Sequence, residues 1–258
     1  MKKVLTIAGS DCSGGAGIQA DLKTILAHEC YGMSVITALT AQNTRGVHDT
    51  LSVEHTFVES QLRCVFDDIY PDAIKIGMLL NKEIAESVSI KLFEYKAKKV
   101  VFDPVMVSSS GRRLLDDEAI SLIKRKLLPL VEILTPNICE AEVLSGVSIN
   151  SKEDMINSAK QIELLYKGYI LIKGGHSIDN ADDLLYKNNE ITWFSGERIE
   201  NSNSHGTGCT LSSAIASNLA LGYDAYESVG RAKLYINRLL ENKMNLGHGS
   251  GPLNHIVR

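Results

Sequence analysis

Short apolar runs alternate with longer stretches of helical periodicity along most of this chain. Parallel strands need a crossover of a dozen or more residues, usually a helix, so this alternation favours a parallel sheet. The central run Val100-Val101-Phe102 is apolar without alternation, as expected for a strand with both faces buried. The sequence therefore predicts an α/β fold with a mostly parallel sheet and helices on both faces. The expected strands, each with the helix that follows it, are residues 4–8 and 18–30, 33–40 and 55–69, 73–76 and 82–96, 99–102 and 116–128, 131–134 and 152–166, and the strand 169–172.

The last third of the chain shows a different pattern. Two short apolar runs, residues 183–186 and 191–194, flank Lys187-Asn188-Asn189-Glu190. This arrangement is typical of an antiparallel hairpin, which would add an edge to the sheet. Two helices are expected after it, over residues 207–221 and 224–243.

Length, charge and cysteine content narrow the class of protein. The 258 residues suffice for one α/β domain or two smaller ones, and the lack of a linker, composition shift or repeat favours a single domain over residues 1–258. A net charge of -4 gives no electrostatic reason to expect nucleic acid as a partner. The first apolar run is too short for a signal peptide, and no apolar run approaches the ~20 residues that span a bilayer. The short apolar runs predict no membrane association. The five cysteines are scattered without a C-x-x-C pair, so we expect a reducing, cytoplasmic setting.

The stretch 203–216 begins small and polar, with glycines at 206 and 208, and continues as a run of helix formers. A glycine loop that enters a helix turns backbone N–H groups toward one point, and the helix N-terminus adds a partial positive charge, so the stretch predicts an anion site for a phosphoryl group. Cys209 falls in the first turn of that helix, where the same field favours the thiolate. We therefore expect a lowered pKa for this thiol and a role as a base. The alternative is a tight turn before an ordinary packing helix, with Cys209 a small buried residue.

Other chemical groups come directly after predicted strands, where the ligand crevice of an open parallel sheet lies. Asp103 precedes Pro104, a place suited to a metal-associated acid. Asn137 and Glu140 are three residues apart at a helix start, where their oxygens could hold a hydrated Mg²⁺; a capping box is the alternative. Lys173 follows a strand beside two glycines, where it could meet phosphate oxygens. Together with the anion site and the base, these groups are what phosphoryl transfer needs.

The ends of two further strands offer groups for an aromatic ring. The amide of Gln42 can pair with both a donor and an acceptor on a heteroaromatic ring, and a structural amide that caps a loop is the alternative. Met78 suits the wall of such a pocket, with a plain core methionine as the alternative. The loop 9–17 adds one carboxylate, Asp11. It also matches a G-x-G-x-x-A dinucleotide pattern, but the acidic residue expected about 20 positions later is missing, so NAD binding is disfavoured.

In their order and spacing these motifs resemble a known family. The chain resembles, nearly end to end, the hydroxymethylpyrimidine/phosphomethylpyrimidine kinases of thiamine biosynthesis, which are members of the ribokinase superfamily. The motifs that carry the resemblance are Ala8-Gly9-Ser10-Asp11, Gly14-Gly15-Ala16-Gly17-Ile18-Gln19-Ala20-Asp21, Thr40-Ala41-Gln42-Asn43-Thr44, Lys75-Ile76-Gly77-Met78, Asp103-Pro104-Val105-Met106, Thr135-Pro136-Asn137 with Glu140-Ala141, Lys173-Gly174-Gly175-His176 and His205-Gly206-Thr207-Gly208-Cys209-Thr210.

The resemblance implies a ribokinase-like three-layer α/β/α fold and a kinase that uses ATP and Mg²⁺. The substrates that it implies are 4-amino-5-hydroxymethyl-2-methylpyrimidine and then its monophosphate, which becomes the pyrophosphate. We also expect a homodimer. By motif position, the implied catalytic residues are Cys209 as base with Gly206, Thr207 and Gly208 as anion hole; the nucleotide contacts are Lys173, Asn137, Thr207 and Gly208; the substrate contacts are Gly9, Asp11, Gln42, Met78, Val105 and Cys209; and the metal ligands are Asp103 and Glu140.

Two other functions are alternatives. A pyridoxine/pyridoxal kinase of vitamin B6 salvage shares this scaffold and the glycine–cysteine loop, and Gln42 is the discriminator because its amide complements an aminopyrimidine edge. A non-catalytic pyrimidine-binding sensor would have no use for Lys173, Glu140 and Cys209 together. Residues 107–113, which are rich in serine, are a candidate flap over the nucleotide.

Overall fold

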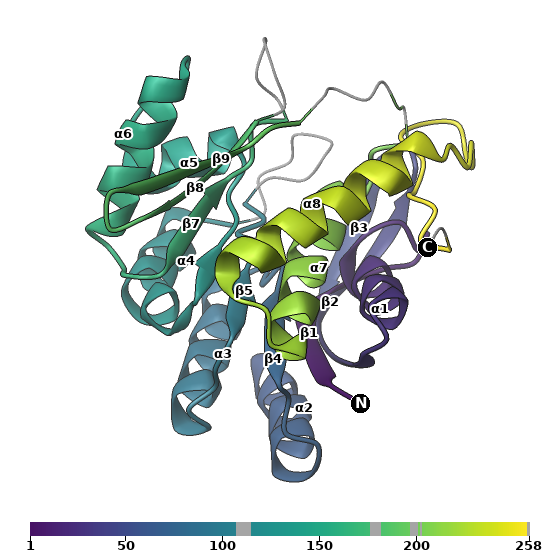
Figure 1. The fold of residues 1–258 in the computed structure, drawn as a ribbon. Helices are drawn as coiled ribbons and strands as arrows, with labels where there is room; N and C mark the ends of the chain where they lie inside the picture. Colours follow the sequence, from purple (N-terminus) through teal and green to yellow (C-terminus); the bar gives the residue numbers. More distant parts are fainter. Residues whose placement is uncertain (107–114, 176–181, 197–200, 202, 257–258) are drawn as a thin grey trace.

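A computed structural model describes residues 1–106, 115–175, 182–196, 201 and 203–256 of the chain. Within these residues one nine-stranded sheet runs through the molecule, in the order β3-β2-β1-β4-β5-β6-β7-β8-β9 (Figure 1). The six strands from β2 to β7 in this order pair in parallel, and both edges are antiparallel. The strands are β1 (Lys3–Asp11), β2 (Tyr31–Asn43), β3 (Gly46–Ser52), β4 (Ala73–Ile76), β5 (Val100–Phe102), β6 (Ile133–Leu134), β7 (Tyr169–Ile172), β8 (Asp183–Lys187) and β9 (Glu190–Phe194).

Helices cover both faces of the sheet, which makes three layers (Figure 1). Strand residues alternate between the two faces: Leu5 and Ile7 pack with Val58 and Ile84, whereas Val4 packs with Ile215 of the opposite layer. The first layer contains α2 (His55–Asp68), α3 (Lys82–Glu94), α4 (Asp117–Leu122), α5 (Ile138–Ser145) and α6 (Lys152–Glu163), and the second contains α1 (Gly17–Ala27), α7 (Thr207–Leu221) and α8 (Ala225–Glu241).

The structure confirms the predicted fold class, with the hairpin β8–β9 at one edge. The sequence did not predict the second antiparallel edge, where β3 pairs with a β2 that extends to Asn43. The reason is that β3 is a ribbon with both faces mostly in solvent, so its residues carry no apolar alternation.

The helix expected over residues 116–128 is shorter than predicted. It is α-helical only as far as Leu122, continues as a π-helical turn over Ile123–Leu127 and ends in a 3₁₀ turn over Leu128–Leu130. Pro129 has no backbone N–H to donate and stops the helix at this point.

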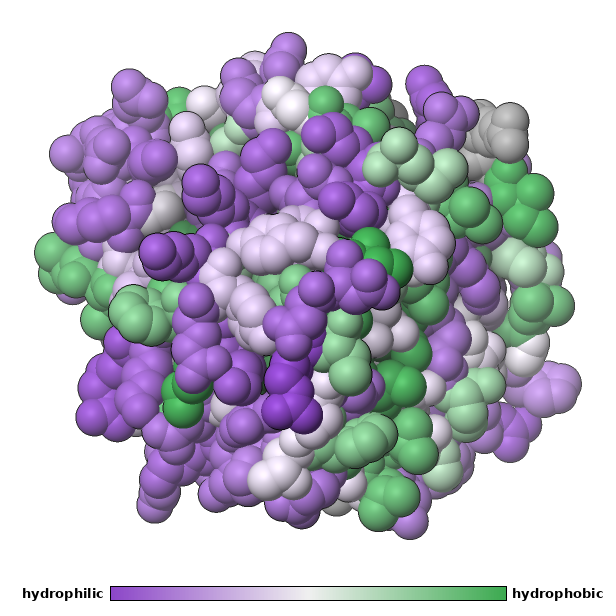
Figure 2. Space-filling model, turned by 90° about the horizontal axis from the view of Figure 1, so that it is seen from below, coloured by the Kyte–Doolittle hydropathy of each residue, from purple (hydrophilic) through white to green (hydrophobic). Residues whose placement is uncertain are grey.

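Figure 2 shows the end of the molecule that lies lowest in Figure 1, where hydrophilic and hydrophobic residues are interspersed. Scattered apolar side chains are normal on a protein surface, so this face by itself indicates no binding site. In the part of the chain that the structure describes, no helix is both long enough and apolar enough to cross a bilayer.

Candidate active site

The predicted site residues lie at or after the carboxyl ends of the parallel strands, as expected for the crevice of such a sheet. Asp11 ends β1, Gln42 lies near the end of β2, Met78 follows β4, Asp103 follows β5 and Lys173 follows β7. Parallel strands point the same way, so these residues lie at the same end of the sheet, where the carboxyl ends of the strands meet.

The glycine loop before α7 forms a helix start, as the sequence predicts. Gly206 is the N-cap, with a φ of 81°, a left-handed conformation that favours glycine. A Cβ at this position would overlap the carbonyl oxygen of Gly15, so the α7 loop lies directly against the loop after β1. Thr207, Gly208 and Cys209 make the first turn, whose backbone N–H groups have no partners within the helix; the Thr207 amide donates to the carbonyl oxygen of Ser204 at 3.3 Å.

An ion pair faces this helix start. Lys173 Nζ lies 2.7 Å from Asp103 Oδ1, and Asp103 is buried. A Cβ on Gly208 would lie 3.3 Å from Asp103 Oδ2 and 3.4 Å from Lys173 Nζ. Burial acts to lower the pKa of Lys173, but Asp103 and Glu140 outweigh it and raise that pKa. A permanent positive charge therefore lies beside the first turn of α7.

The capping box that was the alternative for Asn137 and Glu140 is present. The backbone N–H of Glu140 donates to Asn137 Oδ1 at 2.9 Å, and the backbone N–H of Asn137 donates to Glu140 Oε2 at 2.8 Å. Asn137 also pairs with Lys173 through an isolated parallel bridge. Burial, reinforced by the charge of Asp103 and opposed by Lys173, raises the pKa of Glu140 to about 7.

No cluster of three or more His, Cys, Asp and Glu side chains that could hold a metal occurs in the described residues. Mg²⁺ does not need such a cluster, since it is usually bound by one or two carboxylates together with waters and substrate phosphates. Asp103 and Glu140 are two carboxylates of this kind around one lysine, so the residues fit a Mg²⁺ that arrives with a nucleotide.

The expectation of a lowered pKa for Cys209 is wrong. Burial of the sulfur raises its pKa to about 11; Lys75 acts to lower this pKa, whereas Asp21 and Asp103 raise it further. The field of the helix start is present as predicted, but desolvation of the thiolate outweighs it. At neutral pH the side chain is therefore a thiol.

A buried ion pair whose charges act on Cys209 was not predicted from the sequence. Lys75 and Asp21 form a fully buried ion pair, and Asp21 also accepts hydrogen bonds from Thr6 at 2.6 Å and Ser213 at 2.7 Å. Ser213 lies one turn along α7 from Cys209. The available signal was a lysine inside the otherwise apolar strand β4, because a buried charge at such a place needs a partner.

The predicted ring pocket has a glycine and a methionine in contact. A Cβ on Gly9 would come within 2.5 Å of Met78 Cε, so a larger residue at position 9 would displace this thioether. Val105 is half-buried two residues beyond Asp103. The candidate flap, residues 107–113, lies outside the described residues.

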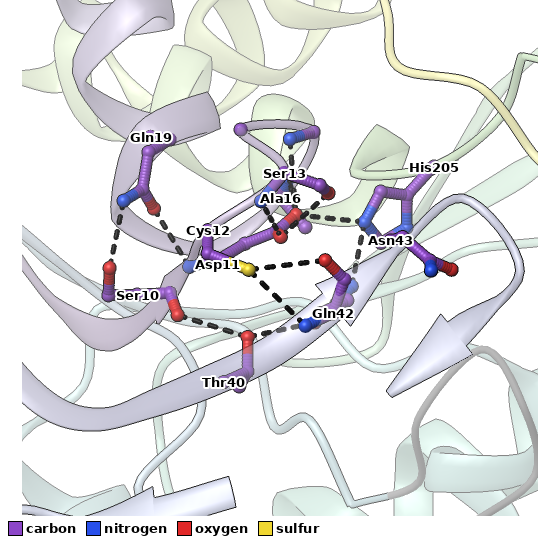
Figure 3. A network of polar contacts seen from close by, with 12 residues as sticks. Ser10, Asp11, Cys12, Ser13, Ala16, Gln19, Thr40, Gln42, Asn43 and His205 are labelled. Carbon is purple, nitrogen blue, oxygen red and sulfur yellow. Dashed lines mark hydrogen bonds and ion pairs between the residues drawn. The ribbon is translucent and has the colours of Figure 1, made fainter. Parts of the chain in front are cut away.

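Asp11 is buried, and its carboxylate is occupied by its own loop. One oxygen accepts hydrogen bonds from the amide and hydroxyl of Ser13, both at 2.8 Å. The other accepts from the amides of Gly15 and Ala16 and lies 3.0 Å from His205 Nε2 (Figure 3). Through these contacts Asp11 holds its own loop and His205. No role for His205 was predicted from the sequence.

Comparison with known proteins identifies the family of this chain. A family model described as phosphomethylpyrimidine kinase matches residues 11–254. The chain belongs to the phosphomethylpyrimidine kinase family. Among its relatives, the thiamine biosynthesis bifunctional protein ThiED of Geobacter sulfurreducens is 47% identical over 98% of this chain, which spans only 52% of that protein. The hydroxymethylpyrimidine/phosphomethylpyrimidine kinase of Bacillus subtilis is 40% identical, with 99% of this chain and 95% of that protein covered.

Solved structures agree with this family membership. The phosphomethylpyrimidine kinase of Clostridium difficile 630 superposes with a TM-score of 0.83 at 46% identity, covering 92% of this chain and 98% of that one. The ADP complex of Bacillus subtilis pyridoxal kinase superposes with a TM-score of 0.91 at 36% identity, covering 100% and 98%. The phosphomethylpyrimidine kinase family and pyridoxal kinases thus share this scaffold, and the chain is a phosphotransferase, as the sequence predicted.

Proposed function

We propose that this chain transfers the terminal phosphoryl group of ATP to the hydroxymethyl group of 4-amino-5-hydroxymethyl-2-methylpyrimidine, and then adds a second phosphoryl group to the monophosphate. The observation that carries the proposal is the Lys173–Asp103 pair against Gly208 at the start of α7. A lysine and a helix N-terminus meet there, at the crevice of a chain whose relatives bear this activity in their names.

Each group has a distinct task in this proposal. Lys173 and the amides of residues 206–208 would bind phosphate oxygens and stabilise the charge that moves between them. Asn137 would contact the nucleotide from the start of α5. A Mg²⁺ held by Asp103 and Glu140 would neutralise phosphate charge.

Cys209, in its thiolate form, is the group proposed to take the proton of the attacking hydroxyl and become the thiol. The oxygen of that hydroxyl bonds to phosphorus, the bond from phosphorus to the β-phosphate oxygen breaks, and ADP leaves. With a pKa of about 11 the thiolate is the minor form in the substrate-free protein. Lys75 supplies the nearby positive charge that favours the thiolate when it forms.

The remaining expectations are part of the same proposal. Residues 1–258 would act as one kinase domain in the cytoplasm, as a homodimer, with ATP and small molecules as partners and neither nucleic acid nor membrane. Light scattering on the purified protein tests the dimer, since a homodimer has twice the 28.2 kDa of the chain.

A substrate panel with MgATP tests the activity. The panel contains the hydroxymethylpyrimidine, its monophosphate, pyridoxine and pyridoxal, and kcat/KM is measured for each. The proposal requires the highest values for the two pyrimidines. Turnover of the vitamin B6 compounds alone would instead identify a pyridoxal kinase, and binding without turnover would identify a sensor.

The pyridoxal kinase alternative has one specific observation in its favour, the TM-score of 0.91 with the Bacillus subtilis enzyme. A shared scaffold does not decide the substrate, because function lies in the site residues. Gln42 favours the pyrimidine, since an amide offers both a donor and an acceptor to an aminopyrimidine edge.

A further inference from the structure

One imidazole nitrogen connects two residues of the predicted substrate site. Nε2 of His205 lies 3.0 Å from Asp11 Oδ2 and 2.8 Å from Gln42 Nε2 (Figure 3). The other end of the Gln42 amide, Oε1, lies 3.2 Å from Thr40 Oγ1, and this hydroxyl lies 3.0 Å from the carbonyl oxygen of Ser10. A continuous polar chain therefore runs from the loop after β1 to β2.

The donors and acceptors of this chain can be assigned. Burial acts to raise the pKa of Asp11, but hydrogen bonds, among them those from the hydroxyl and backbone amide of Ser13 and the backbone amide of Ala16, keep it below the usual range, so Asp11 is a carboxylate that only accepts. An unprotonated His205 Nε2 would place its lone pair against Asp11 Oδ2, two acceptors 3.0 Å apart. Nε2 of His205 therefore carries a proton.

The proton on His205 decides which way the Gln42 amide faces. A protonated Nε2 opposite the amide nitrogen would place two donors together, whereas the amide oxygen at that position accepts. Turning the amide by half a rotation also lets its nitrogen donate to Thr40 Oγ1, whose own proton goes to the Ser10 carbonyl. In this orientation no two donors and no two acceptors of the chain face each other: the single proton on Nε2 is shared between Asp11 Oδ2 and the amide oxygen of Gln42, and the second N–H of Gln42 is left for another partner.

His205 itself is rigidly placed. Its backbone amide donates to the carbonyl oxygen of Gly251 at 3.1 Å, and it bridges to Pro252 of the C-terminal segment. Its ring lies against Gly15, where a Cβ would come within 2.5 Å of Cδ2. The imidazole thus has little freedom to turn away from Asp11 and Gln42.

We propose that His205 is a positioning residue for substrate selection: held by Asp11, it donates a hydrogen bond to the Gln42 side chain and so fixes the direction in which this amide meets the ring of the substrate. This inference rests on the proposed function, in which Gln42 reads the aminopyrimidine edge. A fixed amide presents its remaining N–H and lone pair in one order, which suits a ring edge with an amino group beside a ring nitrogen.

Two substitutions separate the hydrogen bond from the packing of the ring. His205→Phe keeps a ring against Gly15 but has no donor, whereas His205→Gln has an amide nitrogen near the place of Nε2 and can donate to both neighbours. We expect His205→Phe to raise both the dissociation constant and KM for the hydroxymethylpyrimidine about tenfold, the effect of one lost hydrogen bond. The change in kcat should be smaller. His205→Gln should stay within about threefold of the unchanged protein.

The opposite ranking, with Phe tolerated and Gln impaired, would show that the ring only packs, and equal effects of the two variants would also overturn the proposal. The melting temperature of each variant is measured to identify unfolding. The ratio of kcat/KM for hydroxymethylpyrimidine over pyridoxal should fall in His205→Phe, because a freely turning amide discriminates less between the two rings.

A spectroscopic measurement on the unchanged protein needs neither activity nor a variant that folds. Long-range ¹H–¹⁵N correlation spectra of the imidazole rings, with His205 assigned by its absence in His205→Gln, report which nitrogen carries a proton. A proton on Nε2 is expected, and an unprotonated Nε2 would overturn the inference. If the protein binds no pyrimidine at all, the proposed function fails, whereas the protonation of Nε2 is decided independently.

Discussion

The ammonium nitrogen of Lys75 lies 2.9 Å from each carboxylate oxygen of Asp21, and both side chains are fully buried. The pair connects β4 to α1, and the Ser213 hydroxyl joins it to α7, one turn from Cys209. A buried ion pair by itself is weak evidence for stability. The charges of both partners act on the Cys209 thiol, which points instead to control of the charge on sulfur.

Substitution of Lys75 and substitution of Asp21 should shift the pKa of Cys209 in opposite directions. Lys75→Met removes the cation and should raise this pKa; Asp21→Asn removes an anion and should lower it. Because iodoacetamide reacts with the thiolate, alkylation of Cys209 at pH 8 should be slower in the first variant and faster in the second. Mass spectrometry of the peptide that contains Cys209 separates it from the other four cysteines.

Thr24→Val is the matched control for that experiment, since Thr24 is also fully buried on α1 and its hydroxyl donates to the Ala20 carbonyl of the same helix. It should leave the alkylation rate unchanged. A double Lys75→Met, Asp21→Asn variant leaves no buried charge unpaired and covers the case in which a single variant unfolds. Shifts in the same direction for the two single variants would refute this account of the pair.

Removal of the thiol should abolish most of the turnover. Cys209→Ala is expected to lower kcat by about 10²–10⁴-fold, the usual contribution of a general base, while the dissociation constant of the pyrimidine changes less than about tenfold. Isothermal titration and a coupled ADP assay measure the two quantities. Cys64→Ala, an exposed position on α2, is the control. Near-normal turnover in Cys209→Ala would remove the thiol from the chemistry.

Glu140 should make stability depend on pH in an unusual direction. Its pKa is raised from 4.5 to about 7, so between these values the folded protein binds more protons than the unfolded one, and stability falls as pH rises. Glu140→Gln keeps an acceptor for the Asn137 amide and cannot titrate. The free energy of unfolding of both proteins is measured by urea titration at pH 5 to 8. As the pH increases, the wild-type protein should lose stability relative to Glu140→Gln. A constant difference would contradict the raised pKa.

The left-handed glycine at the start of α7 should tolerate no side chain. Gly206→Ala combines backbone strain of about 1–2 kcal/mol with overlap on the Gly15 carbonyl, so the loop must move. Gly222 ends α7 with a φ of 106° and has open space, so Gly222→Ala carries strain alone. We expect a clear rise in KM for ATP only in Gly206→Ala. Equal kinetics of the two variants would show that the contact with Gly15 does not shape the proposed anion site.

The parts of this protein that sequence predicted share a local origin. Strand and helix order follow from periodicity, and the start of α7 follows from a glycine loop before a helix. The capping box of Asn137 and Glu140 was also visible, as the alternative to a metal pair. The exposed ribbon β3 was missed because an element without a buried face leaves no pattern.

The sequence by itself thus determined a mostly parallel sheet with one antiparallel edge hairpin, helices on both of its faces, and the strand ends at which chemical groups gather. Only the tertiary structure decided that Cys209 is a thiol, that Lys75 and Asp21 form a pair and that Gln42 meets His205. The physical reason is that burial and the charges of distant segments set protonation and hydrogen bonding. Periodicity and turn chemistry depend on neighbours in the chain, whereas desolvation depends on neighbours in space.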